Sequence, residues 1–167
     1  MNLPAASSED LLFDAARRGD VSALRSLLAT GLAVDTANFN GFTPLVLAAY
    51  DNQAEATAFL LGAGANPNAQ DITGNTALMG VSFKGYPEIA RLLIARGASL
   101  NLQNGSGGTA LIFATMFGRN ELVQLLLDAG ADRAIADARG FTALDLAGQQ
   151  GNEQACALLG GQAKAAE

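Results

Sequence analysis

A repeat of 33 residues runs through most of the chain and restricts the folds it can adopt. A glycine, a threonine and a leucine recur in register at Gly41, Gly74, Gly107 and Gly140, at Thr43, Thr76, Thr109 and Thr142, and at Leu45, Leu78, Leu111 and Leu144. Paired apolar residues keep the same spacing at Leu27–Leu28, Leu60–Leu61, Leu93–Ile94 and Leu126–Leu127. Such a period indicates an array in which each repeat is one supersecondary unit that stacks on its neighbours.

Each unit has the sequence pattern of two short helices. Thr43 is a candidate N-cap, and Pro44 follows at the first helical position, where its missing N–H costs nothing. We expect a first helix over Leu45–Tyr50 and a second over about Ala54–Leu61. Asn52 separates them, because asparagine tolerates the left-handed backbone conformation better than most residues.

Composition excludes several classes of function. The 167 residues carry a net charge of -6, and a phosphate-binding surface needs clustered Lys and Arg, so we expect no nucleic-acid partner. No apolar run approaches the length of a membrane span, so we expect no membrane partner. The chain has no histidine, which removes the commonest general base and metal ligand. We therefore expect no catalytic residue, metal or cofactor, and we expect Cys156 to be a buried structural thiol.

The repeated pattern resembles the ankyrin repeat family, whose unit carries a T-P-L-H-x-A signature. The matching segments are Thr43-Pro44-Leu45, Thr76-Ala77-Leu78, Thr109-Ala110-Leu111 and Thr142-Ala143-Leu144, and the closing segments Gly64-Ala65-Asn66, Gly97-Ala98-Ser99 and Gly130-Ala131-Asp132. The family histidine is replaced every time, by Val46, Met79, Ile112 and Asp145. We expect packing to replace the hydrogen bonds that this ring makes in the family.

The resemblance implies an all-α repeat fold, an α-solenoid of helix-turn-helix units joined by β-turn loops. The repeat domain is expected over residues 9–160, in five units at about 9–40, 41–73, 74–106, 107–139 and 140–160. Residues 1–8 are expected to form a flexible N-terminus, and residues 161–167 a polar tail. The first and last units depart from the pattern, as expected of units that cap a stack.

The resemblance also implies that a partner binds the concave face of the inner helices. The residues expected there are Arg17, Arg18, Tyr50, Asp51, Phe83, Lys84, Met116, Phe117 and Gln149. Tyr50, Phe83 and Met116 would form an apolar strip of about 20 Å with Phe117 beside it. Aromatic and methionine side chains are typical of interface centres. The alternative is that these rings fold down and cover the bases of the turns as part of the core.

The tips of the turns are a second candidate surface. The residues expected to contribute are Phe39, Phe42, Ile72, Asn75, Arg139 and Phe141. Some of these rings could instead pack between adjacent turns, and a single exposed apolar residue means little.

These patterns predict a non-catalytic module that binds another protein, similar to the short single-domain ankyrin proteins of bacteria. One alternative is an inhibitor or immunity-type regulator of an enzyme or toxin, and another is a structural adaptor without a dominant binding patch. We expect a monomer. The first residues lack the cationic start and apolar stretch of a signal peptide, so we expect a cytoplasmic protein, or a periplasmic one if a signal peptide has been removed.

Overall fold

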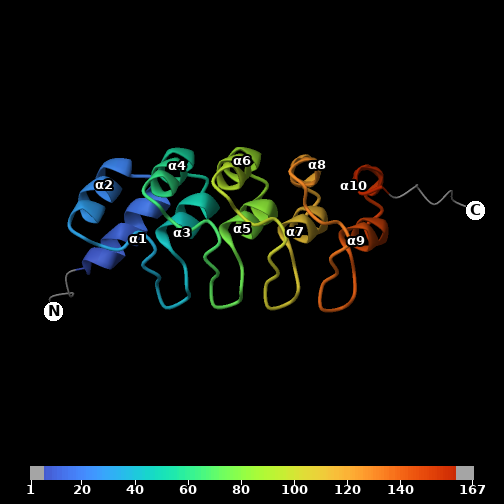
Figure 1. Ribbon diagram of the computed structural model, residues 1–167, viewed down its shortest axis with the longest axis horizontal. Helices are drawn as coiled ribbons and strands as arrows, with labels where there is room; N and C mark the ends of the chain where they lie inside the picture. The colour runs from blue at the N-terminus through green and yellow to red at the C-terminus, as the bar shows by residue number, and fades with distance from the viewer. Residues whose placement is uncertain (1–5, 161–167) are drawn as a thin grey trace, which may run out of the picture.

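The computed structural model describes residues 6–160, and within them ten helices form a row of five helix pairs (Figure 1). The helices of the first three pairs are α1 (Ser8–Arg18), α2 (Val21–Ala29), α3 (Pro44–Tyr50), α4 (Ala54–Gly62), α5 (Ala77–Lys84) and α6 (Pro87–Ala95). The last two pairs are α7 (Ala110–Met116), α8 (Asn120–Asp128), α9 (Ala143–Gln149) and α10 (Glu153–Leu158).

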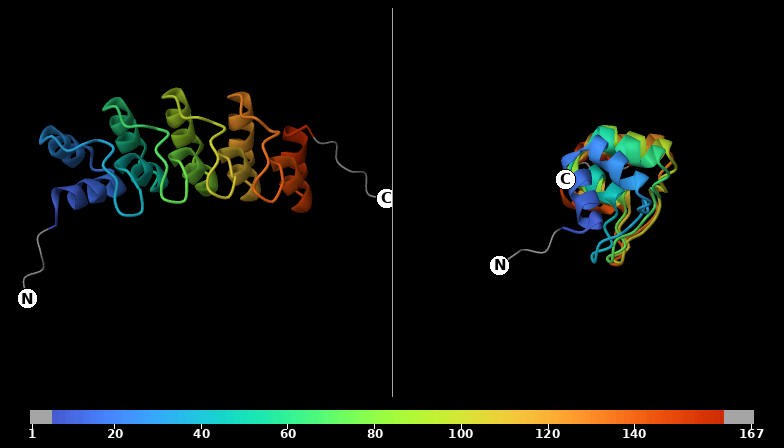
Figure 2. Two further views of the ribbon diagram at one scale, coloured as in Figure 1. Left: turned by 60° about the horizontal axis from the view of Figure 1, so that its bottom comes forward. Right: turned by 90° about the vertical axis from the view of Figure 1, so that its left-hand side faces the viewer.

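The helices lie in two layers. The odd-numbered helices contact one another in sequence and form the inner row, and the even-numbered helices form the outer row. The connecting turns project from one side of the stack, and they nearly superimpose in the view along its axis (Figure 2). The described residues contain no strand and a single isolated antiparallel bridge between Ala136 and Thr142. The predicted all-α repeat solenoid is therefore confirmed.

Local signals set the helix boundaries where the sequence predicts them. The Thr43 hydroxyl accepts a hydrogen bond from the Val46 amide at 3.3 Å, and the threonines of the other three periods cap α5, α7 and α9 in the same way. Asn52 follows α3 with a φ of 60°, the one left-handed backbone among the described non-glycine residues. Pro87 occupies the first position of α6.

The first helix begins slightly earlier than the predicted repeat domain. The Ser7 hydroxyl accepts from the Asp10 amide at 3.0 Å and the Ser7 amide donates to the Asp10 carboxylate at 3.1 Å, which forms a capping box at the start of α1. Residues 7 and 8, which we expected to belong to a flexible N-terminus, thus take part in the helix start. Residues 1–5 and the predicted tail at 161–167 lie outside the described residues.

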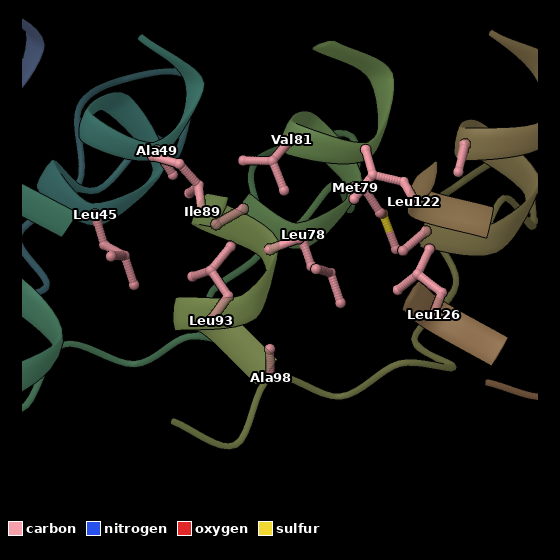
Figure 3. Close-up of a cluster of buried hydrophobic side chains, with 14 of the residues drawn as sticks. Leu45, Ala49, Leu78, Met79, Val81, Ile89, Leu93, Ala98, Leu122 and Leu126 are labelled. Carbon is pink, nitrogen blue, oxygen red and sulfur yellow. The ribbon is translucent and has the colours of Figure 1, made fainter. Parts of the chain in front are cut away.

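Small side chains allow the inner helices to pack side by side. Each inner helix carries two small residues at the same register, and all of them except Gly148 are buried. These pairs are Ala15–Ala16, Ala48–Ala49, Val81–Ser82, Ala114–Thr115 and Ala147–Gly148. Larger apolar residues fill the space between the two layers, where Leu45 and Leu78 of the inner helices meet Leu93 and Leu126 of the outer helices (Figure 3). Each unit therefore completes its core only with its neighbours.

The residues at the repeat position of the family histidine interact in three different ways: by packing, through a sulfur atom and through a carboxylate. Met79 and Ile112 are buried and Val46 is half-buried, so packing occupies most of this column, as expected. The Met79 sulfur additionally accepts from the Thr76 amide at 3.4 Å. Asp145 is exposed, and its carboxylate accepts from the Thr142 amide at 2.8 Å, so a polar cap rather than packing serves the last unit.

Hydrogen bonds between backbones link each turn to the next. The Ile72 amide donates to the Asn40 carbonyl at 3.1 Å, the Gly105 amide to the Thr73 carbonyl at 2.9 Å, and the Ala138 amide to the Ser106 carbonyl at 2.9 Å. These contacts fix the turns relative to one another at the same register in every period.

Two buried hydroxyl groups have no hydrogen-bond partner within residues 6–160, those of Thr57 and Ser82. An unpaired buried hydroxyl costs free energy that an apolar group of the same shape does not. We expect Thr57→Val to raise the free energy of unfolding by about 1 kcal/mol, measured by urea denaturation. The control is Thr115→Val, because the Thr115 hydroxyl donates to the Leu111 carbonyl at 2.9 Å and its removal should bring no gain. An equal response of the two variants would show that the Thr57 hydroxyl is not a source of instability.

Candidate functional site

A groove of about 460 Å³ opens where the inner helices α1, α3, α5 and α7 meet the turns. Its lining is predominantly apolar, with a few polar groups at the edges. The lining residues are Arg17, Phe42, Val46, Leu47, Tyr50, Asp51, Asp71, Asn75, Thr76, Met79, Gly80, Phe83 and Phe113. The groove brings together six residues that the sequence analysis assigned to the two candidate surfaces: Arg17, Phe42, Tyr50, Asp51, Asn75 and Phe83.

Four aromatic residues form a connected cluster on the inner helices: Tyr50, Phe83, Phe113 and Phe117. Tyr50 and Phe83 stack with ring centroids 6.4 Å apart and an interplanar angle of 5°. Phe117 contacts Phe83 edge to face at 4.5 Å and stacks with Phe113 at 6.5 Å. Tyr50 and Phe117 are each 41% exposed, so this aromatic cluster is neither buried core nor fully solvated.

The aromatic cluster follows a different path from the predicted strip. Met116, which we expected to continue from Phe83, is half-buried, packs against the core and does not line the groove. Phe117 lies against Phe83 in its place. Phe113 was not among the predicted site residues, because its position within α7 is typical of a core side chain.

Charged and amide side chains surround the C-terminal ends of the inner helices. The Lys84 ammonium lies 4.9 Å from the centre of the Tyr50 ring, and Arg119 Nε donates to the Phe83 carbonyl at 3.1 Å. Amide side chains cover two other helix ends, because Gln53 donates to the Arg17 carbonyl and Gln150 donates to the Met116 carbonyl. Arg18 pairs with Asp14 at 2.9 Å within α1, outside the groove lining. Gln149 is exposed at the end of α9.

The turn tips differ between the two ends of the stack. Phe39 is 91% exposed and Ile72 is 73% exposed, and the backbone hydrogen bond between Ile72 and Asn40 holds their turns side by side. The equivalent tips of the later turns carry only Gly105 and Ala138. The large apolar tips are thus confined to the part of the stack that also holds the groove.

At the last turn, the predicted residues interact with one another. Arg139 lies over the half-buried Phe141 ring at 5.3 Å and pairs with Asp137 at 2.6 Å. These contacts satisfy Arg139 within its own turn.

A further column of residues shapes every turn and was missed by the sequence analysis. At the base of each turn, one side-chain oxygen accepts hydrogen bonds from two backbone amides, which lie two and four residues further along the chain. The residues that carry this oxygen are Asn38, Asp71, Asn104 and Asp137. The signal was present at the same spacing of 33 residues, but the column alternates between asparagine and aspartate. Both residues can form this turn because both offer a side-chain oxygen at the same place.

The hydrogen bonds lower the pKa of the two aspartates in this column. Partial burial raises the pKa of Asp71, but hydrogen bonds from Thr73 and Asn75 outweigh it, and the net pKa is lowered. The side-chain hydrogen bond from Arg139 is the main cause of the lowered pKa of Asp137. Both groups therefore stabilise the fold in the ionised form.

Other kinds of site find no support in the described part of the chain. Residues 6–160 contain no cluster of three or more His, Cys, Asp or Glu side chains that could hold a metal ion. None of the ten helices described there is long and apolar enough to cross a membrane. Cys156 is only half-buried, so the expectation of a buried thiol was wrong: α10 is the last helix within residues 6–160, and no further helix described there packs on its far side.

Comparison with known families agrees with this geometry. The family model described as ankyrin repeats (3 copies) matches residues 12–104 and 78–166. The chain therefore belongs to the ankyrin repeat family, whose members are generally protein–protein interaction modules and typically non-catalytic. No curated protein matches the chain.

The turn column predicts the acid stability of the fold. A lowered folded-state pKa contributes stability that is present above the unfolded value of about 4 and is lost as the pH falls through the folded value. We expect Asp71→Asn with Asp137→Asn to keep the turns, since Asn38 and Asn104 already occupy this column, and to move the acid-unfolding midpoint to lower pH. Circular dichroism during an acid titration measures this midpoint. Asp51→Asn is the control, and an equal shift in that variant would contradict the role of the turns.

Proposed function

We propose that the chain is a non-catalytic module that binds a partner protein through the groove and the neighbouring turn tips. The observation that carries this proposal is the partly exposed aromatic cluster beside the groove. Aromatic residues are enriched at the centres of protein interfaces, where desolvated anchors carry most of the binding energy.

The stacked units favour docking without large rearrangement. The groove residues lie on helices and turns that neighbouring units hold in place, so a partner would meet a preorganised surface and lose little freedom in ordering it. The same surface could serve an inhibitor or immunity-type regulator, which is one version of this function. A structural adaptor is less well supported, because Tyr50, Phe83, Phe113 and Phe117 form one connected aromatic cluster on the inner helices.

We further propose that the module acts as a monomer in the cytoplasm or, after removal of a signal peptide, in the periplasm. Its acidic balance disfavours nucleic acid as a partner.

Site-specific photocrosslinking in living cells tests the proposed function. A photoreactive phenylalanine analogue placed at Tyr50 should give a discrete crosslinked protein, because a docked partner would cover this ring. The same analogue at Gln124, an exposed position on α8 of the outer row, is the control and should give none. A crosslink pattern that is the same at both positions would contradict binding in the groove.

Loss of the rings gives a second test. We expect the double variant Tyr50→Ser, Phe83→Ser to retain no partner protein in a pull-down, while its thermal unfolding midpoint changes little. The matched control is Phe59→Ser, which removes a half-buried ring on the outer helix α4 and should keep the partner. If the double variant unfolds while Phe59→Ser stays folded, the two rings belong to the core and the groove is not the binding site.

A further inference from the structure

One position that lines the groove carries no side chain, that of Gly80. One column of the inner helices carries Leu47, Gly80, Phe113 and Leu146, with Asp14 at the same place in the first unit. Of the four units that begin with the repeated threonine, only the third lacks a large apolar residue there. Leu47 and Leu146 are nearly buried, which shows that the fold accommodates a side chain of this size in the column. A Cβ atom at Gly80 would lie 3.2 Å from the Tyr50 ring, so that ring flanks the hollow above the glycine.

The surroundings of this hollow suit one large apolar side chain. Tyr50, Met79, Phe83 and Phe113 line the groove around Gly80. The groove lining also reaches Phe42, Asp71 and Asn75 of the turns and Arg17 of α1, so the groove extends beyond the surroundings of Gly80. A polypeptide segment with an apolar anchor fits both features.

Three cations lie in or beside the groove, although the protein as a whole is negatively charged. Arg17, Lys84 and Arg119 form no salt bridge with any carboxylate of residues 6–160, although the chain has a net charge of -6. Arg17 lines the groove, and the other two lie at the end of α5 against Tyr50 and Phe83.

Two carboxylates oppose these cations. Asp51 is exposed at the end of α3, and Asp71 is engaged by Thr73 and Asn75 within its own turn, so its oxygens already have donors. Both carboxylates line the groove and keep their charge, so together with Arg17, Lys84 and Arg119 the residues in and beside the groove carry three positive and two negative charges. This small positive excess, in a chain of net charge -6, complements a negatively charged partner segment.

We propose, building on the protein-binding function above, that the groove binds an acidic segment of the partner protein. One aromatic or leucine side chain of that segment enters the hollow over Gly80, and flanking carboxylates lie beside Arg17 and Lys84. The hollow provides the anchor site, and the unpaired cations select the charge of the flanks.

Gly80→Leu fills the hollow without breaking the fold. Gly80 lies inside α5, where replacement of glycine raises helix propensity, and the neighbouring Tyr50 ring is exposed enough to move aside. The matched control is Gly148→Leu, since Gly148 also lies in an inner helix but has no atom within 4 Å of an added Cβ and does not line the groove. We expect both variants to unfold at or above the wild-type temperature.

Selection from a random peptide library displayed on phage tests the specificity directly. Peptides selected on the wild-type protein and depleted on Gly80→Leu should carry one Phe, Trp or Leu flanked by Asp or Glu. Their affinity should fall by about tenfold or more in Gly80→Leu and in Lys84→Glu, and should not change in Gly148→Leu. It should also weaken at high salt. Basic flanks, equal binding to Gly80→Leu, or no selected peptide would overturn the inference.

The photocrosslinking experiment separates this inference from the broader proposal. A partner that still crosslinks at Tyr50 in the Gly80→Leu variant, through a segment without acidic residues, would overturn the acidic anchor and leave the protein-binding function intact. Absence of any crosslink at Tyr50 would overturn both.

Discussion

The structure depends on close side-by-side packing of the inner helices. A single unit has two short helices and one apolar face that it cannot bury alone, so the neighbouring unit must supply the other side of the core. Side chains no larger than valine or threonine at the register of Ala48–Ala49 allow the inner helices to pack closely. Once they do, the leucines between the layers are buried and the turns come within hydrogen-bonding distance of one another.

The same packing explains why loss of one side chain leaves a hollow rather than a collapsed core. Neighbouring units hold α5 on both sides, and backbone hydrogen bonds hold the turns next to it, so the helix cannot shift into the space above Gly80. The surrounding rings stay partly exposed because they have no side chain to cover them. A rigid stack thus turns a local change in sequence into a local change in surface shape.

The repeat order could be predicted because its signals are local and recur at one spacing. Thr43 and Asn52 each act within a single turn of the chain, and the structure places them as expected. The groove was harder to predict because it depends on residues from several units. Gly80 has no helix-breaking role in the sequence pattern, and its effect requires knowing that Tyr50 and Phe113 flank it. The choice between Met116 and Phe117 depended on side-chain direction at the end of α7, where the helical register ends.

The distribution of charge shows why the net charge of the chain is a poor guide to its partner. Asp71, Asp137 and Asp145 accept hydrogen bonds in turns and at a helix start, and their lowered pKa values show that the fold uses them in the ionised form. Arg17 and Arg18 lie in the last turn of α1 and Lys84 lies in the last turn of α5, where the negative end of the helix dipole favours cations. Part of the acidic charge therefore belongs to the scaffold, and the residues in and beside the groove carry a small excess of positive charge although the chain as a whole is acidic.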